Sequence, residues 1–161
     1  MEEYEYSFKV KDIKPFIDYC LSHEYIFEDE YEQIRILYKN GGKVMARITR
    51  NCSKDGDVEI LNFKEDNPDD NILKVSRESK DLLITDENRE FVKSLLEILE
   101  LREEKKLSRK RFVYKKDKVV FEIDRYTEPK MNVVAIEGNK DEVNSVYKTL
   151  KRVIAKNIFN K

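Results

Sequence analysis

The chain has 161 residues, of which 40% are hydrophobic and 40% are charged. A chain of this length can bury a substantial core, and we expect residues 1–161 to form one domain. The 32 basic and 33 acidic residues leave a net charge of −1, so no overall field attracts the chain to nucleic acid or to a membrane surface. Binding of an anion would therefore require a local concentration of arginine and lysine.

The two cysteines, Cys20 and Cys52, have no CxxC spacing and no cluster of histidines beside them, which disfavours a zinc site. Free thiols in a charged chain without a signal peptide are typical of a reducing compartment, and we expect a cytoplasmic protein. No apolar run approaches the roughly 20 residues that a membrane-spanning helix requires. The single histidine, His23, is predicted to lie in a surface turn, which disfavours a Ser–His–Asp triad.

The first predicted strand, residues 3–10, alternates polar and apolar side chains. Successive side chains of a strand point to opposite faces. The polar face carries two carboxylates, a hydroxyl and an ammonium: Glu3, Glu5, Ser7 and Lys9. Carboxylates two residues apart on a strand lie about 7 Å from each other, close enough to share one cation. A sheet with one solvated face gives the same alternation, so the later strands must decide between the two interpretations.

The remaining elements follow from periodicity, from turn signals and from helix caps. A short helix follows Asp12, another begins at Thr85 or Asp86, and a capping box at Asn139 opens the last. Further strands or short edges are predicted over residues 25–38, 43–49, 58–64, 72–76, 82–84, 103–115, 119–126 and 131–137. Asn40-Gly41-Gly42 predicts a hairpin turn. The sum is about eight strands in an antiparallel meander, interrupted by three helices.

Charged side chains recur on the less apolar face of these strands. The basic members are Arg35, Lys43, Arg47, Arg109 and Arg111, and the acidic ones are Glu122, Asp124 and Glu137. If the sheet closes into a barrel, both sets line its interior. Arginine binds phosphate oxygens in bidentate fashion, and Mg²⁺ takes carboxylate oxygens together with substrate phosphates. Such a lining suits an anionic substrate with a divalent cation, whereas an open sheet would leave weak surface ion pairs.

In their order along the chain, these segments resemble the CYTH, or triphosphate tunnel metalloenzyme, family. Residues 3–10, Glu-Tyr-Glu-Tyr-Ser-Phe-Lys-Val, resemble its Glu-x-Glu-x-Lys signature. The other matching segments are residues 34–36 and 47–50 for a basic strand pair, 77–78 for a weaker match, 109–114 for a later basic strand, 121–124 for an apolar-Asp strand, and 135–138 for a Glu-x-Glu strand. Two positions depart from the pattern, because Ser7 replaces a lysine and Ala135 replaces a glutamate.

The resemblance implies an α+β fold in which an antiparallel eight-stranded β-barrel closes into a tunnel with flanking helices. Glu3, Glu5 and Glu137 would hold Mg²⁺ or Mn²⁺, and the catalytic group would be Glu5, Glu137 and Asp124. Asp124 would lie beside the metal or orient a basic residue. The phosphate-binding residues would be Lys9, Arg35, Arg47, Arg109 and Arg111. A metal-associated water would attack the terminal phosphorus and release orthophosphate. Simple alternation places Arg77 on the face of Leu73 and Val75, so it points into the tunnel only if a bulge intervenes.

Three functions remain open from the sequence. The first is a metal-dependent triphosphatase acting on inorganic triphosphate, a nucleoside triphosphate or thiamine triphosphate. The second is the adenylate cyclase activity of the family, for which the sequence identifies no adenine pocket. The third is a tunnel that binds polyphosphate or nucleotides without turnover, which Ser7 and Ala135 support. The expected partner is a triphosphate-containing small molecule or polyphosphate, with no membrane, no specific nucleic acid, and a monomer or homodimer as the assembly.

Overall fold

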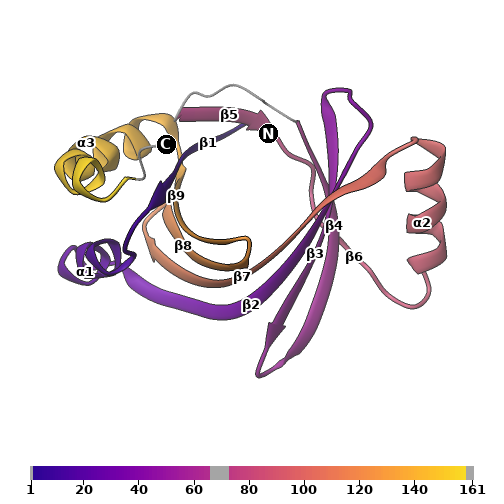
Figure 1. Ribbon diagram of the computed structural model, residues 1–161, viewed down its shortest axis with the longest axis horizontal. Coiled ribbons are helices and arrows are strands. Elements are labelled where there is room, and N and C mark those ends of the chain that lie inside the picture. Colours follow the sequence, from indigo (N-terminus) through magenta and orange to yellow (C-terminus); the bar gives the residue numbers. More distant parts are fainter. Residues whose placement is uncertain (1, 66–72, 159–161) are drawn as a thin grey trace.

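The computed structural model of the chain describes residues 2–65 and 73–158. These residues form an α+β fold in which a strongly curled antiparallel sheet carries helices on its outer side (Figure 1). The elements are β1 (Glu2–Val10), α1 (Lys14–Ser22), β2 (Ile26–Lys39), β3 (Val44–Ser53), β4 (Gly56–Glu65), β5 (Leu73–Arg77), β6 (Leu82–Leu83), α2 (Arg89–Ile98), β7 (Arg102–Lys116), β8 (Val119–Glu128), β9 (Lys130–Gly138) and α3 (Lys140–Asn157).

Helix α3 begins at the cap residue that the sequence predicts, whereas the N-cap of α1 is Ile13, one residue after the predicted Asp12. The Asp12 carboxylate accepts a hydrogen bond from the Lys14 amide at 3.0 Å, just before the first turn of α1. The Asn139 side chain accepts a hydrogen bond from the Glu142 amide at 2.9 Å, which confirms Asn139 as the N-cap of α3, and the Glu142 carboxylate accepts from the side-chain amide of Asn139. Among the described helices, none combines the length and the apolar character that crossing a membrane requires.

The strands of the sheet follow the order β5-β1-β9-β8-β7-β2-β3-β4-β6. Every pairing between strands is antiparallel, as predicted. The prediction of a simple meander is wrong, because β1 lies between β5 and β9, and β2 pairs with β7. Alternation of polar and apolar residues fixes which face a side chain occupies but not which strand lies beside it.

The prediction of a closed eight-stranded barrel is also wrong. Nine strands form the sheet, and its described residues remain an open, curled layer. Near one end of β4, a single bridge joins Lys64 to Glu78, and the Ser79 amide donates a hydrogen bond to the Phe63 carbonyl at 2.9 Å. Farther along, β6 occupies the edge of β4 at Ile60 and Leu61, so this part of the edge is not available for closure. We call the contact between β4 and residues 78–79 the seam.

Two separate apolar cores cover the outer face of the sheet. Helices α1 and α3 lie over one part of the curl and α2 lies over the other, well apart from them (Figure 1). The first core contains Phe8, Phe16, Phe121, Ile136 and Leu150, among others, and the second contains Ala46, Leu61, Ile84, Val92, Leu96 and Leu101. Since side chains alternate along each strand, the residues between these apolar ones point into the curl. The fold therefore places the polar face of the sheet on the inside.

Candidate functional site

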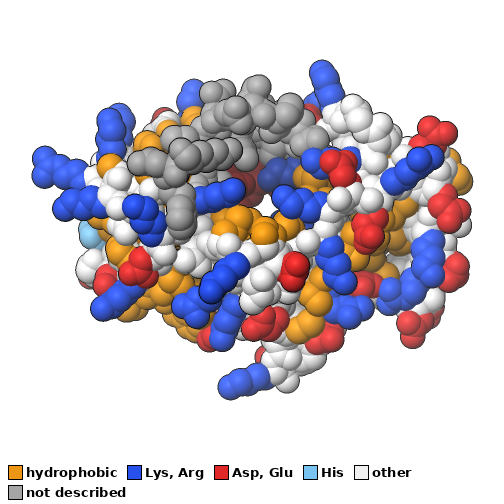
Figure 2. All heavy atoms as spheres, viewed as in Figure 1, with side chains coloured by type: hydrophobic (Ala, Val, Ile, Leu, Met, Phe, Trp, Pro, Cys, Tyr) orange, Lys and Arg blue, Asp and Glu red, His pale blue; other side chains and the backbone are white. Residues whose placement is uncertain are grey.

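The curled sheet encloses a polar cavity of about 220 Å³. Its lining comes from β1 to β4, from β7 to β9 and from Glu78 after β5: Glu3, Glu5, Ser7, Arg35, Arg47, Lys64, Glu78, Arg109, Arg111, Glu122, Asp124, Tyr126, Val133, Ala135 and Glu137. Figure 2 shows a hollow near the centre of this face, with acidic and basic side chains around it. The charged alternation in the sequence therefore produces a shared interior rather than a solvated surface.

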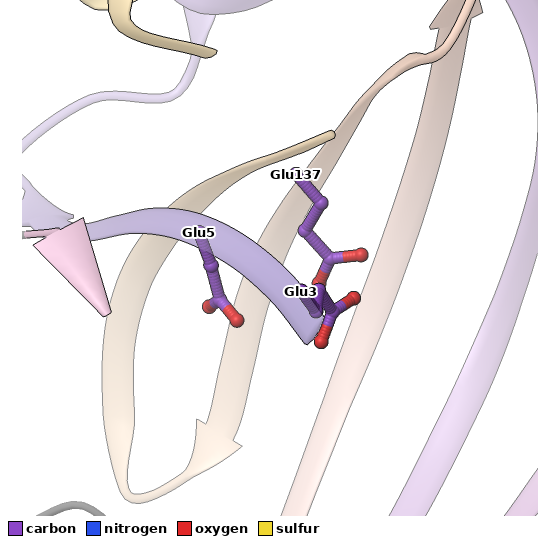
Figure 3. A group of neighbouring side chains, drawn as sticks. All are labelled: Glu3, Glu5 and Glu137. Carbon is purple, nitrogen blue, oxygen red and sulfur yellow. The ribbon is translucent and has the colours of Figure 1, made fainter. Parts of the chain in front are cut away.

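Three carboxylates form a compact cluster on the wall made by β1 and β9. Glu5 is the cross-strand partner of Glu137, and Glu3 lies two residues from Glu5 on the same face. One carboxylate oxygen from each of Glu3, Glu5 and Glu137 lies within 4.8 Å of the other two (Figure 3). This is the donor chemistry that a hard divalent cation prefers, and the three residues are those predicted from the sequence.

The cluster concentrates negative charge in a partly desolvated place. Burial and the neighbouring Glu78 raise the pKa of Glu3 to about 7. Burial, Glu122 and the two carboxylates of β1 raise the pKa of Glu137 well above its ordinary value. The Lys64 ammonium offsets part of this charge, since it lies 3.8 Å from a Glu3 oxygen and 3.7 Å from a Glu5 oxygen. A divalent cation at the cluster would relieve the same repulsion.

Arg109 and Arg111 of β7 are held by acidic and polar partners on β2 and β8. Asp124, with 2% of its side chain exposed, accepts hydrogen bonds from Arg111 Nε and Nη2, each at 2.8 Å. Arg111 Nη1 donates to Glu122 at 2.7 Å, and Arg109 Nη1 lies 3.3 Å from Asp124 Oδ2. Arg109 also donates to Gln33 and Tyr126. Asp124 therefore orients basic residues, which is one of the two roles predicted for it.

The electrostatics of Glu122 and Arg111 follow from this pairing. Burial is the largest single influence on Glu122 and would raise its pKa, but the charges of Arg111, Arg35 and Arg109, together with Glu137, outweigh burial and hold that pKa at about 2. Burial likewise works against the Arg111 cation, yet Glu122 and Asp124 raise its pKa well above the ordinary value. Both groups are fully ionised at neutral pH, so this wall of the cavity is a network of compensated charges.

Arg35 and Arg47 stand on β2 and β3 with fewer partners. Arg47 donates to Asn62 at 3.0 Å and pairs with Glu78. Arg35 Nε donates to Thr49 at 3.1 Å, and no ion pair between described residues includes Arg35. Loss of solvent and the nearby guanidinium of Arg109, followed by that of Arg47, lower the pKa of Arg35 to about 9. A partly buried cation crowded by other cations is a place where an anion is stabilised.

The structure separates the sequence-predicted residues into those that line the cavity and those that do not. Arg35, Arg47, Arg109, Arg111, Asp124 and the three clustered glutamates line it, whereas Lys9 is exposed and lies outside its lining. Arg77 points outward, with 78% of its side chain exposed, and pairs with Glu65. Simple alternation therefore holds in β5, and Glu78 occupies the inward position one residue later.

Sequence reasoning missed Lys64, Glu78 and Tyr126 as lining residues, and it placed Glu122 on the inner face without giving it a role in the site. Tyr126 shares the face of Asp124, so strict alternation along β8 would have identified it. Lys64 and Glu78 meet Glu3 and Glu5 because β4 and the end of β5 come together at the seam. No pattern within either segment indicates that contact.

Comparisons with known proteins give matches in structure and none in sequence. No family model matches the chain, and no curated protein matches it. PH1012 from Pyrococcus horikoshii aligns with a TM-score of 0.71 at 18% identity, covering 95% of this chain and 88% of that one. A conserved hypothetical protein from Pyrococcus furiosus aligns with a TM-score of 0.68 at 23% identity, with the same coverage. HpAC1 from Hippeastrum, a proposed adenylyl cyclase with a dominant triphosphatase activity, aligns with a TM-score of 0.61 at 14% identity, covering 96% of this chain and 87% of that chain.

These similarities define the class of fold. The curled antiparallel sheet with a charged interior is the fold of the CYTH, or triphosphate tunnel, proteins. The resemblance predicted from the sequence segments is thus confirmed for the fold.

Proposed function

We propose that this chain is a divalent-cation-dependent triphosphatase. The observation that carries the proposal is one cavity in which the Glu3, Glu5 and Glu137 carboxylates lie opposite several guanidinium groups. A triphosphate group is negatively charged and would pair with Arg35, which has no ion pair among the described residues. A divalent cation would offset the carboxylate charge that the single ammonium of Lys64 leaves uncompensated. The shared fold with HpAC1, a protein with triphosphatase activity, supports the same conclusion.

The carboxylate cluster fits Mg²⁺ or Mn²⁺. Glu3, Glu5 and Glu137 would hold the cation, because their oxygens lie within 4.8 Å of one another and are hard donors. When bound, the cation supplies Lewis acidity at phosphoryl oxygens and offsets the negative charge of phosphates and carboxylates. Lys64, which contacts Glu3 and Glu5 in the structure, would then be free to turn toward phosphate oxygens.

The arginines would neutralise the charge that spreads over the phosphoryl oxygens during transfer. Arg35 is the strongest candidate for direct contact, since most of its donors have no partner among the described residues. Arg109 and Arg111 are already oriented by Asp124, and their remaining donors would face the ligand without reorganisation. Water would be the attacking group, and no covalent intermediate on the protein is required.

Adenylate cyclase activity has less support from the cavity. Cyclisation requires a place for adenine, and the described lining is mostly charged. Tyr126 is the one aromatic residue in that lining, and its hydroxyl is engaged with Arg109. Binding of triphosphate or polyphosphate without turnover remains the alternative that Ser7 and Ala135 favour.

The test is phosphate release from tripolyphosphate, ATP and thiamine triphosphate with Mg²⁺ or Mn²⁺. The wild type is compared with Glu5→Ala, which removes one carboxylate of the cluster. We expect release by the wild type and a loss of about 100-fold or more in the variant, comparable to loss of a principal transition-state contact. Arg125→Met, on the exposed outer face of β8, serves as the matched control.

Each alternative has a distinct outcome in the same experiment. Unchanged release by Glu5→Ala would remove the cation assignment. Tight binding of tripolyphosphate without release from any substrate would identify a binding module. Formation of cyclic AMP from ATP would identify a cyclase.

A further inference from the structure

Ala135 leaves a short side chain in the cavity wall, and the residues beside it are known from the sheet register. Its cross-strand partner on β1 is Ser7, and its partner on β8 is Glu122. All three line the cavity. Directly opposite residues of antiparallel strands have Cβ atoms about 4.5–5.5 Å apart, so the Glu122 side chain can extend into the space that a longer residue at position 135 would fill.

Glu122 connects the carboxylate cluster to the arginine network. Its side chain, 17% exposed, accepts a hydrogen bond from Arg111 at 2.7 Å. On the other side, β8 pairs Val120 with Glu137 and Glu122 with Ala135, so Glu122 lies diagonally across from Glu137, and both line the cavity. Two carboxylates on neighbouring strands that face one cavity repel each other, and a cation between them would relieve that repulsion. Glu122 is not one of the three residues whose oxygens are mutually within 4.8 Å, and it reaches that cluster through Glu137.

We propose that Glu122 is a fourth carboxylate of the cation site, supplied by β8 at the level where β9 has Ala135. This inference rests on the proposed function, because it takes Glu3, Glu5 and Glu137 as the residues that hold the cation. The carboxylate has moved to the neighbouring strand, and it still points into the same cavity. The competing interpretation is that Glu122 serves only as a counter-ion of Arg111.

A swap of the carboxylate between the two strands separates these roles. Binding of Mn²⁺ is measured by calorimetry, without any phosphate ligand, for wild type, Glu122→Gln, Ala135→Glu and the double variant. We expect Glu122→Gln to weaken Mn²⁺ binding by about tenfold or more. Ala135→Glu in the Glu122→Gln background returns a carboxylate to the same level of the wall, so it is expected to restore most of the affinity. Unchanged Mn²⁺ affinity in Glu122→Gln, or no restoration in the double variant, overturns the proposal.

Glu59 provides a matched control on the outer face of the sheet. Its side chain is also 17% exposed and pairs with Arg50 and Arg89, but it lines the groove beneath α2 instead of the cavity. Glu59→Gln is therefore expected to bind Mn²⁺ like the wild type. Thermal unfolding followed by circular dichroism checks that each variant is folded.

Glu122→Asp covers the case in which Glu122→Gln does not fold. This variant keeps the charge opposite Arg111 and retracts the carboxylate by one methylene. We expect it to weaken Mn²⁺ binding, and wild-type affinity in this variant would support the counter-ion interpretation.

The titration requires no turnover, so its result is separate from that of the proposed function. If the wild type binds Mn²⁺ but releases no phosphate, the proposed triphosphatase activity is overturned. The carboxylate swap between positions 122 and 135 still decides the role of Glu122 in that case. Hydrolysis by the wild type together with unchanged Mn²⁺ affinity in Glu122→Gln overturns the role of Glu122 alone. A wild type that binds no Mn²⁺ overturns both.

Discussion

The two basic walls of the cavity differ in how their charges are compensated. On the wall of β7 and β8, Arg111 has a bidentate partner in Asp124 and a second partner in Glu122. On the wall of β2 and β3, Arg35 has a threonine hydroxyl and no ion pair among the described residues. The first wall is compensated without a ligand, whereas on the second wall Arg47 has Glu78 as a counter-ion and Arg35 has none among the described residues. Under the proposed function, the arginine of the first wall would contribute mainly to the fold, and Arg35 mainly to ligand binding.

This contrast follows from the cost of desolvating charge. A buried cation without a counter-ion lowers the stability of the folded state. Removing one member of a buried ion pair also lowers stability, because it leaves the other member charged, buried and without a partner. Arg35→Met and Arg111→Met delete the same group on two adjacent walls, so the two variants should differ in activity and in stability.

Of the two arginine variants, Arg35→Met is expected to have the larger effect on activity. Loss of this guanidinium should lower kcat/KM for tripolyphosphate by about 100-fold, in the range found when a single charge-stabilising donor is removed. The melting temperature should remain equal to that of the wild type or rise, because a poorly solvated cation has been removed. Phosphate release and thermal unfolding measure the two quantities. A large loss of stability in Arg35→Met would contradict the distinction between the walls.

The largest effect on stability is expected for Arg111→Met. The variant leaves the buried Asp124 with the longer Arg109 contact, and we expect the free energy of unfolding to fall by about 3 kcal/mol. Urea unfolding measures this change. Arg125→Met, exposed on the same strand as Asp124, should unfold like the wild type. Equal stability of Arg111→Met and wild type would mean that this wall is not a structural network.

A smaller effect is expected from pH in the absence of divalent cations. The pKa of Glu3 is raised from 4.5 to about 7 in the folded protein, mainly by burial and then by Glu78. The folded state therefore binds more protons than the unfolded state in this interval, so the contribution of Glu3 to stability is complete below pH 4.5 and is lost as the pH rises to about 7.

Thermal unfolding in a chelator across this interval tests the sign of the effect. In Glu3→Gln, the melting temperature should fall less steeply as the pH rises from 4.5 to about 7. Excess Mg²⁺ should raise the melting temperature of the wild type more at the upper end of this pH interval than at the lower end. A decline of equal slope in Glu3→Gln would assign the pH dependence to other groups.

The smallest effect is expected for Lys64→Met. The ammonium of Lys64 contacts Glu3 and Glu5 at 3.7–3.8 Å, where it would compete with the cation of the proposed function. Partly exposed ion pairs contribute about 1 kcal/mol or less, so Mn²⁺ affinity without phosphate should rise by a few-fold. Binding of tripolyphosphate should weaken, because a cation has been removed from the lining. Calorimetric titrations with Mn²⁺ and with tripolyphosphate measure the two changes. An unchanged affinity for both would show that Lys64 contributes to the binding of neither.

The sequence was sufficient to predict which face of each strand is polar, and hence most of the cavity lining. Glu3 and Glu5 on β1, Arg109 and Arg111 on β7, and Asp124 on β8 all point inward because alternation has a strict period of two. The same rule correctly placed Arg77 on the outer face. Lys9 satisfies the alternation but is exposed in β1, beyond the cavity lining, and alternation alone carries no information about depth.

The pairing of strands and the partners of individual charges could not be predicted in this way. The contact of β2 with β7 joins segments that are far apart in the chain, and it determines that Gln33 meets Arg109. The proximity of Lys64 to Glu5 depends on the curl of the whole sheet. Such contacts arise from twist and closure, which local sequence patterns do not encode.

The seam has a consequence for how the protein would respond to a ligand in the cavity. Lys64 and Glu78 form the single bridge of the seam and also line the cavity. A ligand that contacts both sides of the cavity would form an additional connection between the two edges of the sheet. Opening of the wall and release of the ligand would then be the same motion, and slower amide hydrogen exchange at Ser79, which donates to Phe63, would report occupancy of the cavity.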